Sequence, residues 1–238
     1  MPSDSHTRNV ADKSYLNNLS EVFLLKVKTG EDTSEICQTL ENLSSSKISQ
    51  FLKKDEDKKA FWTNIYNAYY QILRIHKKQT KPRIYSARLF VIGREKMSLD
   101  DIEHGILRRF RYKYSLGFFA NPFASKFIRL HAVEQIDFRI HFALNCGAKS
   151  CPPISFYNPE QIEQQLDLAT KSFLEQESDI DHSSRKIATT TLFKWFYWDF
   201  GGRKGIDKIF ESILGINISG YKMFFKSFSW EENLHNFK

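Results

Sequence analysis

The chain has 238 residues, of which 41% are hydrophobic and 15% aromatic, and it carries a formal net charge of +7. This is enough apolar material for one large domain or two small ones, and it excludes disorder beyond roughly the first dozen residues. Three cysteines are too few for a disulfide framework, and no apolar run is long enough to span a bilayer. We expect a soluble protein, cytoplasmic as given, or periplasmic or secreted if a signal peptide has been removed.

The N-terminal quarter predicts a tail followed by helices. Residues 1–13 are polar, and we expect them to be flexible. We interpret residues 14–54 as an N-terminal helical extension whose helices offer a surface for self-association. Apolar residues recur at helical spacing in three segments of this extension, 14–28, 33–43 and 46–53, and Gly30 is a plausible stop for the first.

The strongest helix prediction covers residues 56–76. Acidic residues begin this segment and basic residues end it, which suits the helix dipole, and a wide apolar face runs along it. Asn64 and Asn67 lie on one face among large apolar neighbours, although asparagine is a mediocre helix former. Two interpretations stay open: these amides tie down a neighbouring loop, or they line a site.

The middle of the chain predicts a strand and then a helix. Residues 84–92 are typical of a strand. The following helix, 98–110, begins with an arrangement close to a capping box, with Ser98 as N-cap and Asp101 at the third helical position.

Basic and aromatic residues alternate at the end of this second helix. Such interleaving can contact phosphates and stack bases. The basic residues of the whole chain are dispersed, however, and its net charge is modest for a nucleic-acid binder. We therefore interpret the run as a solvated rim above aromatic anchors and expect no nucleic-acid partner. Its members are Arg108, Arg109, Phe110, Arg111, Tyr112, Lys113 and Tyr114.

The C-terminal half predicts more strands and two helices. Helices and strands mix irregularly, so we predict an α+β fold for residues 55–238, with a central mixed or antiparallel sheet packed by helices. Strands are predicted at 126–131, 137–144, 186–192 and in the tail 221–230, and helices at 158–176, beginning at Asn158, and 203–214.

The segment RIHFALNCGAKSCPP, residues 139–153, concentrates reactive residue types. His141, Cys146 and Cys151 follow one another with the spacing H-x4-C-x4-C. Imidazoles and thiols supply nucleophiles, metal ligands and redox pairs. On an extended strand His141 and Cys146 would lie more than about 15 Å apart, so a direct pair requires the chain to turn between them.

Five ordered blocks together resemble one family. They are AFWTNIYNA (60–68), LDDIEHGILRRF (99–110), RIHFALNCGAKSCPP (139–153), a Q-L-D helix near 165–167 and LFKWFYWDFG (192–201). From about residue 55 to the C-terminus, the chain resembles the domain-of-unknown-function family 547. Because that family has no settled activity, the resemblance implies a composite site rather than a reaction. One departure is Ser229, which stands before Trp230 where family members usually carry an aspartate.

Three kinds of function fit these residues. The first is a cysteine- or histidine-dependent hydrolase or transferase, with a weak fold-level analogy to papain-like and transglutaminase-like cores. The second is a disulfide or metal site at Cys146 and Cys151 without turnover, although the spacing is a weak zinc signal. The third is a non-catalytic module that binds a small molecule or peptide, or a scaffold. No nucleotide fingerprint is present, and we expect no cofactor.

The candidate residues come from four of the five blocks. For catalysis they are Cys146 as nucleophile, His141 or His104 as base, and Glu103 or Asn64 to orient an imidazole. For substrate binding they are Asn67, Ser150, Lys194 and Asp199.

Overall fold

The computed structural model describes residues 14–238, so the flexible tail predicted for residues 1–13 lies outside the described residues. About half of the described chain is helical, with 49% helix and 10% strand. Its strands form two separate small sheets, β1–β2 and β3–β4–β5. The prediction of mixed helix and strand is confirmed, but the prediction of a central sheet is wrong, because a buried helix occupies the middle of the fold.

The three predicted N-terminal helices are confirmed. They are α2 (Tyr15–Thr29), α3 (Ser34–Asn42) and α4 (Ser45–Phe51). Gly30 ends α2 in the left-handed conformation, with φ 74°. Leu16, Phe23 and Leu24 of α2 belong to the same hydrophobic cluster as the central helix, so these helices complete the core. The domain boundary after residue 54 stays a prediction.

The central helix is α5 (Asp55–Gln71), which continues into the π-helical turn η1 (Ile72–His76). Every residue from Lys58 to Gln71 is buried. A helix that is buried all round must pack against neighbours on each side. Here α2, the π-helix η2 (Asp101–Leu107) and α8 (Ile162–Glu177) supply those neighbours. This arrangement places both asparagines of α5 in the interior.

The predicted capping box is confirmed, and it positions η2. The Asp101 amide donates to Ser98 Oγ at 3.0 Å, and the Ser98 amide donates to Asp101 Oδ2 at 3.0 Å. The strand predicted before it is shorter than expected. Residues 84–92 divide into α6 (Arg83–Ser86) and β1 (Phe90–Ile92), and β1 pairs antiparallel with β2 (Glu95–Met97).

Two predicted strands are helical instead. Residues 126–131 form α7 (Lys126–His131), where the Ser125 side chain accepts from the Ile128 amide at 3.2 Å. Residues 137–144 contain the 3-10 helix η3 (Phe138–Phe142), where Asp137 accepts from the Arg139 amide at 3.1 Å. In both segments a capping side chain outweighs the strand-like apolar pattern. His141 therefore lies on a 3-10 turn, which removes the strand on which the papain-like analogy depended.

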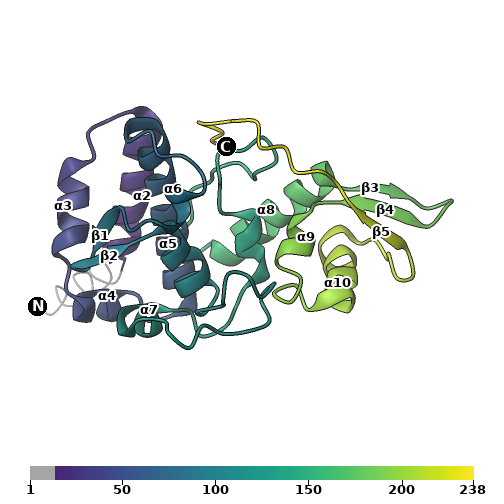
Figure 1. The fold of residues 1–238 in the computed structure, drawn as a ribbon, viewed down its shortest axis with the longest axis horizontal. Helices are drawn as coiled ribbons and strands as arrows, with labels where there is room; N and C mark the ends of the chain where they lie inside the picture. The colour runs from purple at the N-terminus through teal and green to yellow at the C-terminus, as the bar shows by residue number, and fades with distance from the viewer. Residues whose placement is uncertain (1–13) are drawn as a thin grey trace, which may run out of the picture.

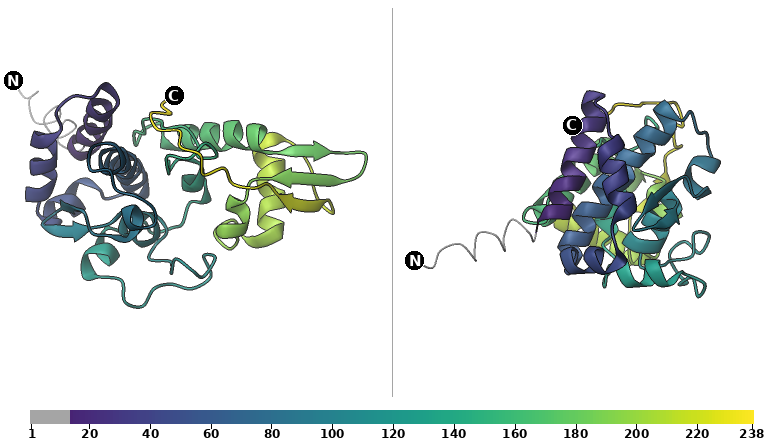
Figure 2. Two further views of the ribbon diagram at one scale, coloured as in Figure 1. Left: turned by 45° about the horizontal axis from the view of Figure 1, so that its top comes forward. Right: turned by 90° about the vertical axis from the view of Figure 1, so that its left-hand side faces the viewer.

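The C-terminal elements largely follow the sequence pattern. The helix α8 begins four residues after Asn158, whose side chain instead accepts from the Gln161 amide in a turn at 3.0 Å. β4 pairs antiparallel with β3 and parallel with β5, at one end of the molecule (Figures 1 and 2). The remaining elements are β3 (Asp179–Asp181), β4 (Lys186–Thr189), α9 (Leu192–Trp195), α10 (Gly202–Leu214) and β5 (Lys222–Phe225).

Two large hydrophobic clusters and one small cluster between α5 and α8 make up the core. One large cluster lies among α2–α7 and the other among α8–α10 and the three-stranded sheet. After β5 the chain runs back across the molecule toward the first group of helices (Figure 1). It pairs there through the bridges Ala148–Glu232 and Ile154–Phe237. None of the helices in residues 14–238 is both long and apolar enough to cross a membrane.

Candidate functional site

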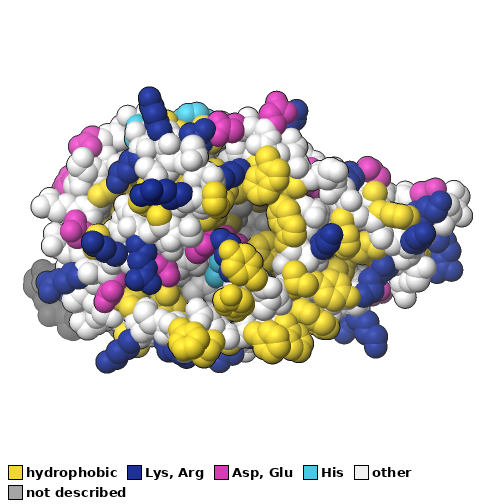
Figure 3. Space-filling view, in the orientation of Figure 1, with side chains coloured by type: hydrophobic (Ala, Val, Ile, Leu, Met, Phe, Trp, Pro, Cys, Tyr) yellow, Lys and Arg dark blue, Asp and Glu magenta, His cyan; other side chains and the backbone are white. Residues whose placement is uncertain are grey.

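A cavity of about 400 Å³ lies between the two large clusters. Hydrophobic side chains surround a hollow in the middle of this face (Figure 3). The lining comes from α5, η2, the loop after η3, α9 and the segment after β5. Apolar and aromatic side chains form most of it: Tyr66, Tyr85, Leu144, Leu192, Trp195, Phe196, Phe228 and Trp230. Its composition, with a few polar groups among apolar walls, is typical of small-molecule sites.

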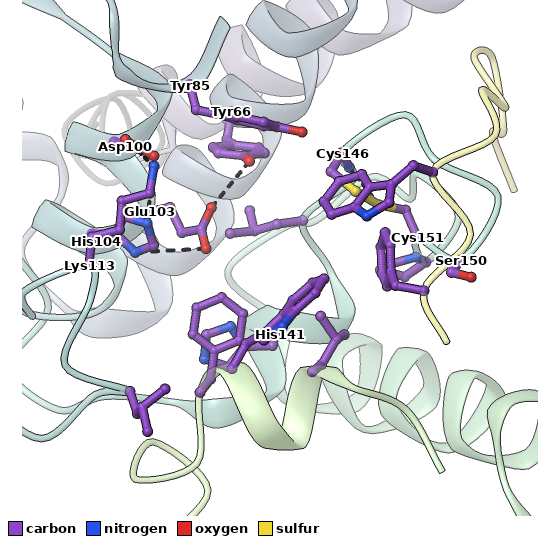
Figure 4. Close-up of a pocket in the computed structure, with 18 of the residues that line it drawn as sticks. Tyr66, Tyr85, Asp100, Glu103, His104, Lys113, His141, Cys146, Ser150 and Cys151 are labelled. Atoms are coloured by element: carbon purple, nitrogen blue, oxygen red, sulfur yellow. Dashed lines mark hydrogen bonds and ion pairs between the residues drawn. A yellow bond between two sulfur atoms is a disulfide. The ribbon is translucent and has the colours of Figure 1, made fainter. Parts of the chain in front are cut away.

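Glu103 is the most perturbed acid in the cavity. Its side chain is 14% exposed, and the Tyr66 hydroxyl donates to Oε2 at 3.2 Å (Figure 4). Burial raises the pKa of Glu103 to about 7, Asp100 adds to the rise, and Arg108 opposes it. A carboxyl group that titrates near neutrality can both donate and accept a proton at physiological pH.

Behind this acid, four side chains form a buried polar network: His104, Arg108, Asp199 and His141. Arg108 Nη1 donates to His104 Nδ1 at 2.6 Å, and Arg108 Nε donates to Asp199 Oδ2 at 2.5 Å. His141 Nε2 lies 2.9 Å from the same carboxylate oxygen. The side chains of Arg108 and Asp199 have no exposed area. The network therefore joins η2, η3 and the turn after α9 at the back of the cavity.

The charges of this network follow from its burial. Burial lowers the pKa of His104 and His141 below the ordinary value, and the Arg108 charge adds to this for both. Burial alone would raise the pKa of Asp199, but hydrogen bonds and charges from His141 and Arg108 outweigh it and lower that pKa to about 2. The network at neutral pH is thus one ion pair between two neutral imidazoles, with the His141 proton on Nε2 and the His104 proton on Nε2.

Aromatic rings restrict access to His141. Its imidazole stacks on Phe196 with ring centroids 3.9 Å apart, and its side chain is only 1% exposed. The Arg108 guanidinium lies over the same Phe196 ring at 4.7 Å. His141 therefore lines the cavity with almost no exposed area, whereas Glu103 offers more of its side chain to a ligand.

The thiol chemistry expected at Cys146 takes a different form in the structure. Cys146 and Cys151 form a disulfide, with Cα atoms 5.9 Å apart, and both line the cavity. A sulfur in a disulfide is not a thiolate nucleophile. The disulfide is the second of the alternatives derived from the sequence. The remaining cysteine, Cys37, is free and half-buried in the N-terminal helices.

The segment after β5 covers the disulfide loop. The Lys149 amide donates to the Glu231 carbonyl at 2.7 Å, and the Asn233 amide donates to the Gly147 carbonyl at 2.9 Å. The Ser229 amide donates to Ser150 Oγ at 3.0 Å, so Ser229 contacts this loop. The pairing brings Phe228 and Trp230 against Trp195, with ring centroids 5.0 and 5.9 Å from it.

Asn64 and Asn67 hold two loops in place. Asn64 Nδ2 donates to the Tyr157 carbonyl at 2.8 Å and Oδ1 accepts from the Tyr157 amide at 3.0 Å. Asn67 makes the same pair of bonds to the Ala143 carbonyl and the Asn145 amide, at 3.0 and 2.9 Å. Both residues are fully buried. Their amides are thus used by backbone groups, which is the first of the two interpretations derived from the sequence.

The structure brings together five of the nine candidate residues at the cavity surface: Glu103, His104, His141, Cys146 and Ser150. Asp199 lies behind the surface as the partner of His141, and Lys194 is exposed on α9. The sequence analysis assigned Arg108 to a solvated basic rim, which is wrong because its side chain is fully buried, and it did not identify Phe196 as a cover. The spacing of Arg108 four residues after His104 in a helix was the available signal.

Among residues 14–238, no three or more His, Cys, Asp or Glu side chains are grouped so that they could hold a metal ion. The comparisons with known proteins give one match. The family model described as "Protein of unknown function, DUF547" matches residues 49–174, which is 126 of the 238 residues and includes Glu103, His104, His141 and both cavity cysteines. No curated protein and no solved structure matches the chain.

Proposed function

Because this chain belongs to the family described as protein of unknown function DUF547, we propose a function from the cavity rather than from relatives. The cavity binds a small ligand with an apolar body and one hydrogen-bonding head group, which lies against Glu103 and Tyr66. The observation that carries this proposal is a space of about 400 Å³ with aromatic walls and one buried carboxyl group that titrates near pH 7.

The apolar walls favour the body of such a ligand. Aromatic rings of the C-terminal segment, Phe228 and Trp230, pack with centroids 4.5 Å apart at an angle of 54° and give this wall a large apolar area. Lys81 lies 4.2 Å from the Trp230 ring and holds its outer face. The disulfide fixes the loop beneath these rings.

The same disulfide supports an exported location for the protein, because disulfides persist in oxidising compartments.

A fluorescent probe tests the proposal without knowledge of the natural ligand. N-phenyl-1-naphthylamine is apolar, carries one N–H donor and brightens in apolar surroundings. We expect saturable binding of one probe per chain. Leu144→Phe, which fills part of the cavity, should weaken binding about tenfold. The matched control is Leu168→Phe on the exposed face of α8, which should bind like the wild type. Equal weakening by both variants, or no saturable binding, would contradict the proposal.

A second candidate function is acid–base catalysis by the same residues, as a histidine-dependent hydrolase or transferase. Glu103 supports it through its pKa of about 7, and His141 through its fixed bond to Asp199. In this form of the protein Cys146 is not available as the nucleophile, so water or a substrate hydroxyl would attack.

Ester hydrolysis separates catalysis from binding. Release of nitrophenol from p-nitrophenyl butyrate should fall about 100-fold in Glu103→Gln and in His141→Asn if these groups transfer protons. Glu175→Gln on the exposed face of α8 is the control and should leave the rate unchanged. Rates in all three variants equal to the wild type would leave ligand binding as the function.

A further inference from the structure

The loop between η2 and α7 exposes an unusual number of aromatic side chains. We call residues 110–123 the aromatic loop. Phe123 is 91% exposed, Tyr114 77%, Phe119 64% and Phe118 56%. The neighbouring Trp198 is 48% exposed and its ring lies 5.4 Å from that of Phe118. Contiguous apolar groups of this kind on a surface mark a contact with another molecule or a membrane.

The aromatic loop has a defined shape. The Tyr112 amide donates to the Phe119 carbonyl at 2.8 Å, and the Trp198 amide donates to the Leu116 carbonyl at 3.0 Å. Gly117 has φ 89°, and a Cβ there would lie 2.1 Å from Asp199 Oδ1, so the loop packs directly on the buried network. The backbone is thus fixed while the rings project outward, which favours a docking surface over a loose loop.

The charged residues of the aromatic loop and its flanks in the sequence are all basic. From residue 104 to residue 133 the sequence contains six Lys and Arg residues and no Asp or Glu. Two of the six are paired, Arg108 with Asp199 and Lys113 with Asp100. The other four have no acidic partner among the residues that the structure describes: Arg109, Arg111, Lys126 and Arg129.

We propose that the aromatic loop docks on the surface of an anionic phospholipid bilayer. Phenylalanine, tyrosine and tryptophan rings enter the headgroup region, and the exposed Arg109 and Lys126 side chains contact lipid phosphates. Phe118, Phe119 and Phe123 carry no hydrogen-bonding group, which suits an apolar boundary, and the modest net charge of the chain argues against a nucleic acid. This proposal does not depend on the identity or existence of a cavity ligand.

Docking through this loop would also set the orientation of the cavity relative to the bilayer. Tyr114 and Leu116 belong to the aromatic loop and line the cavity as well. Hydrophobic side chains surround the hollow and continue below it on the same face (Figure 3). A bilayer in contact with the loop would therefore lie beside the mouth of the cavity.

Vesicle sedimentation tests the proposal on the full chain. We expect the protein to sediment with vesicles of phosphatidylcholine and phosphatidylglycerol, and to be released by high salt, but to stay in solution with phosphatidylcholine alone. The double variant Phe119→Ser/Phe123→Ser should partition about tenfold more weakly, and Arg109→Glu/Lys126→Glu should do the same. The matched control is Val22→Ser/Leu25→Ser, which removes two exposed apolar side chains from α2 and should bind like the wild type.

Three outcomes would overturn the proposal. One is the absence of sedimentation with anionic vesicles by a folded wild type. Another is an equal loss of vesicle binding in the α2 control and the loop variant, which would indicate non-specific hydrophobic adsorption. The third is evidence that the aromatic loop has a different partner. This would be either a solution dimer that Phe119→Ser/Phe123→Ser dissociates, or preferential binding of a single-stranded oligonucleotide over vesicles. The probe measurement with Leu144→Phe is independent of all three.

Discussion

Two walls of the cavity face each other across Figure 4, and they are held in different ways. The network wall consists of Glu103, His104 and His141 with Arg108 and Asp199 behind them. The disulfide wall consists of the loop from Cys146 to Cys151 and the segment after β5. The first is held by a buried ion pair with no exposed side-chain area, the second by one covalent bond and backbone pairing near the surface.

This difference predicts which wall the fold depends on. A buried charge without its partner is far more costly than a broken contact in water. Breaking the ion pair of Arg108 and Asp199 in the network wall should therefore cost more stability than breaking the disulfide of the other wall.

The largest effect is expected from Asp199→Asn. It leaves the Arg108 charge buried without a counter-charge, and we expect the free energy of unfolding in urea to fall by about 3–5 kcal/mol. The matched control is Asp179→Asn, which breaks an ion pair with Lys226 in which Asp179 is 77% exposed and should change stability little. Similar losses in the two variants would show that the network wall is no more costly to break than the surface.

Glu103→Gln should instead raise the free energy of unfolding. The pKa of Glu103 is about 7 in the folded protein and 4.5 without the fold, so the folded state binds more protons between these values. Stability therefore falls as pH rises through this window, and at pH 8 the ionised Glu103 costs about 3 kcal/mol. The free energy of unfolding of Glu103→Gln should exceed that of the wild type by most of this 3 kcal/mol at pH 8, and by less than about 1 kcal/mol at pH 5.

Urea unfolding at the two pH values measures this difference. Glu175→Gln, the same change on an exposed site of α8, provides the control and should show no gain at either pH. A gain for Glu103→Gln that is equal at pH 5 and pH 8 would mean that the carboxyl group is not titrating near neutrality, and both candidate functions would lose their main support.

The sequence predicted local elements and the members of the site better than their arrangement. Ser98 and Asp101 are three residues apart, and the capping box between them could be recognised from the chain alone. The bond between His141 and Asp199 joins residues 58 positions apart and has no local signal. Asp137 was missed as a cap because the alternating Phe138, Ile140 and Phe142 favoured a strand, although the same spacing fits a 3-10 turn.

The prediction of a central sheet is wrong for a related reason. Short apolar runs such as 126–131 are compatible with either strand or helix, and only tertiary packing decides between them. Once both middle runs are helical, no long strands remain to build a large sheet. The blocks that lie inside the family match nevertheless identified residues on both walls, because a family pattern records which side chains meet without specifying how.

Reduction of the disulfide should have the smallest effect of the three. A closed loop of six residues contributes about 2 kcal/mol through loop-closure entropy, so Cys146→Ser/Cys151→Ser should lower the free energy of unfolding by that amount. Thiol titration of unfolded, unreduced protein should find one thiol, Cys37, and three after reduction. Three thiols before reduction would return Cys146 to consideration as a nucleophile. A loss as large as that of Asp199→Asn would instead show that both walls are equally essential to the fold.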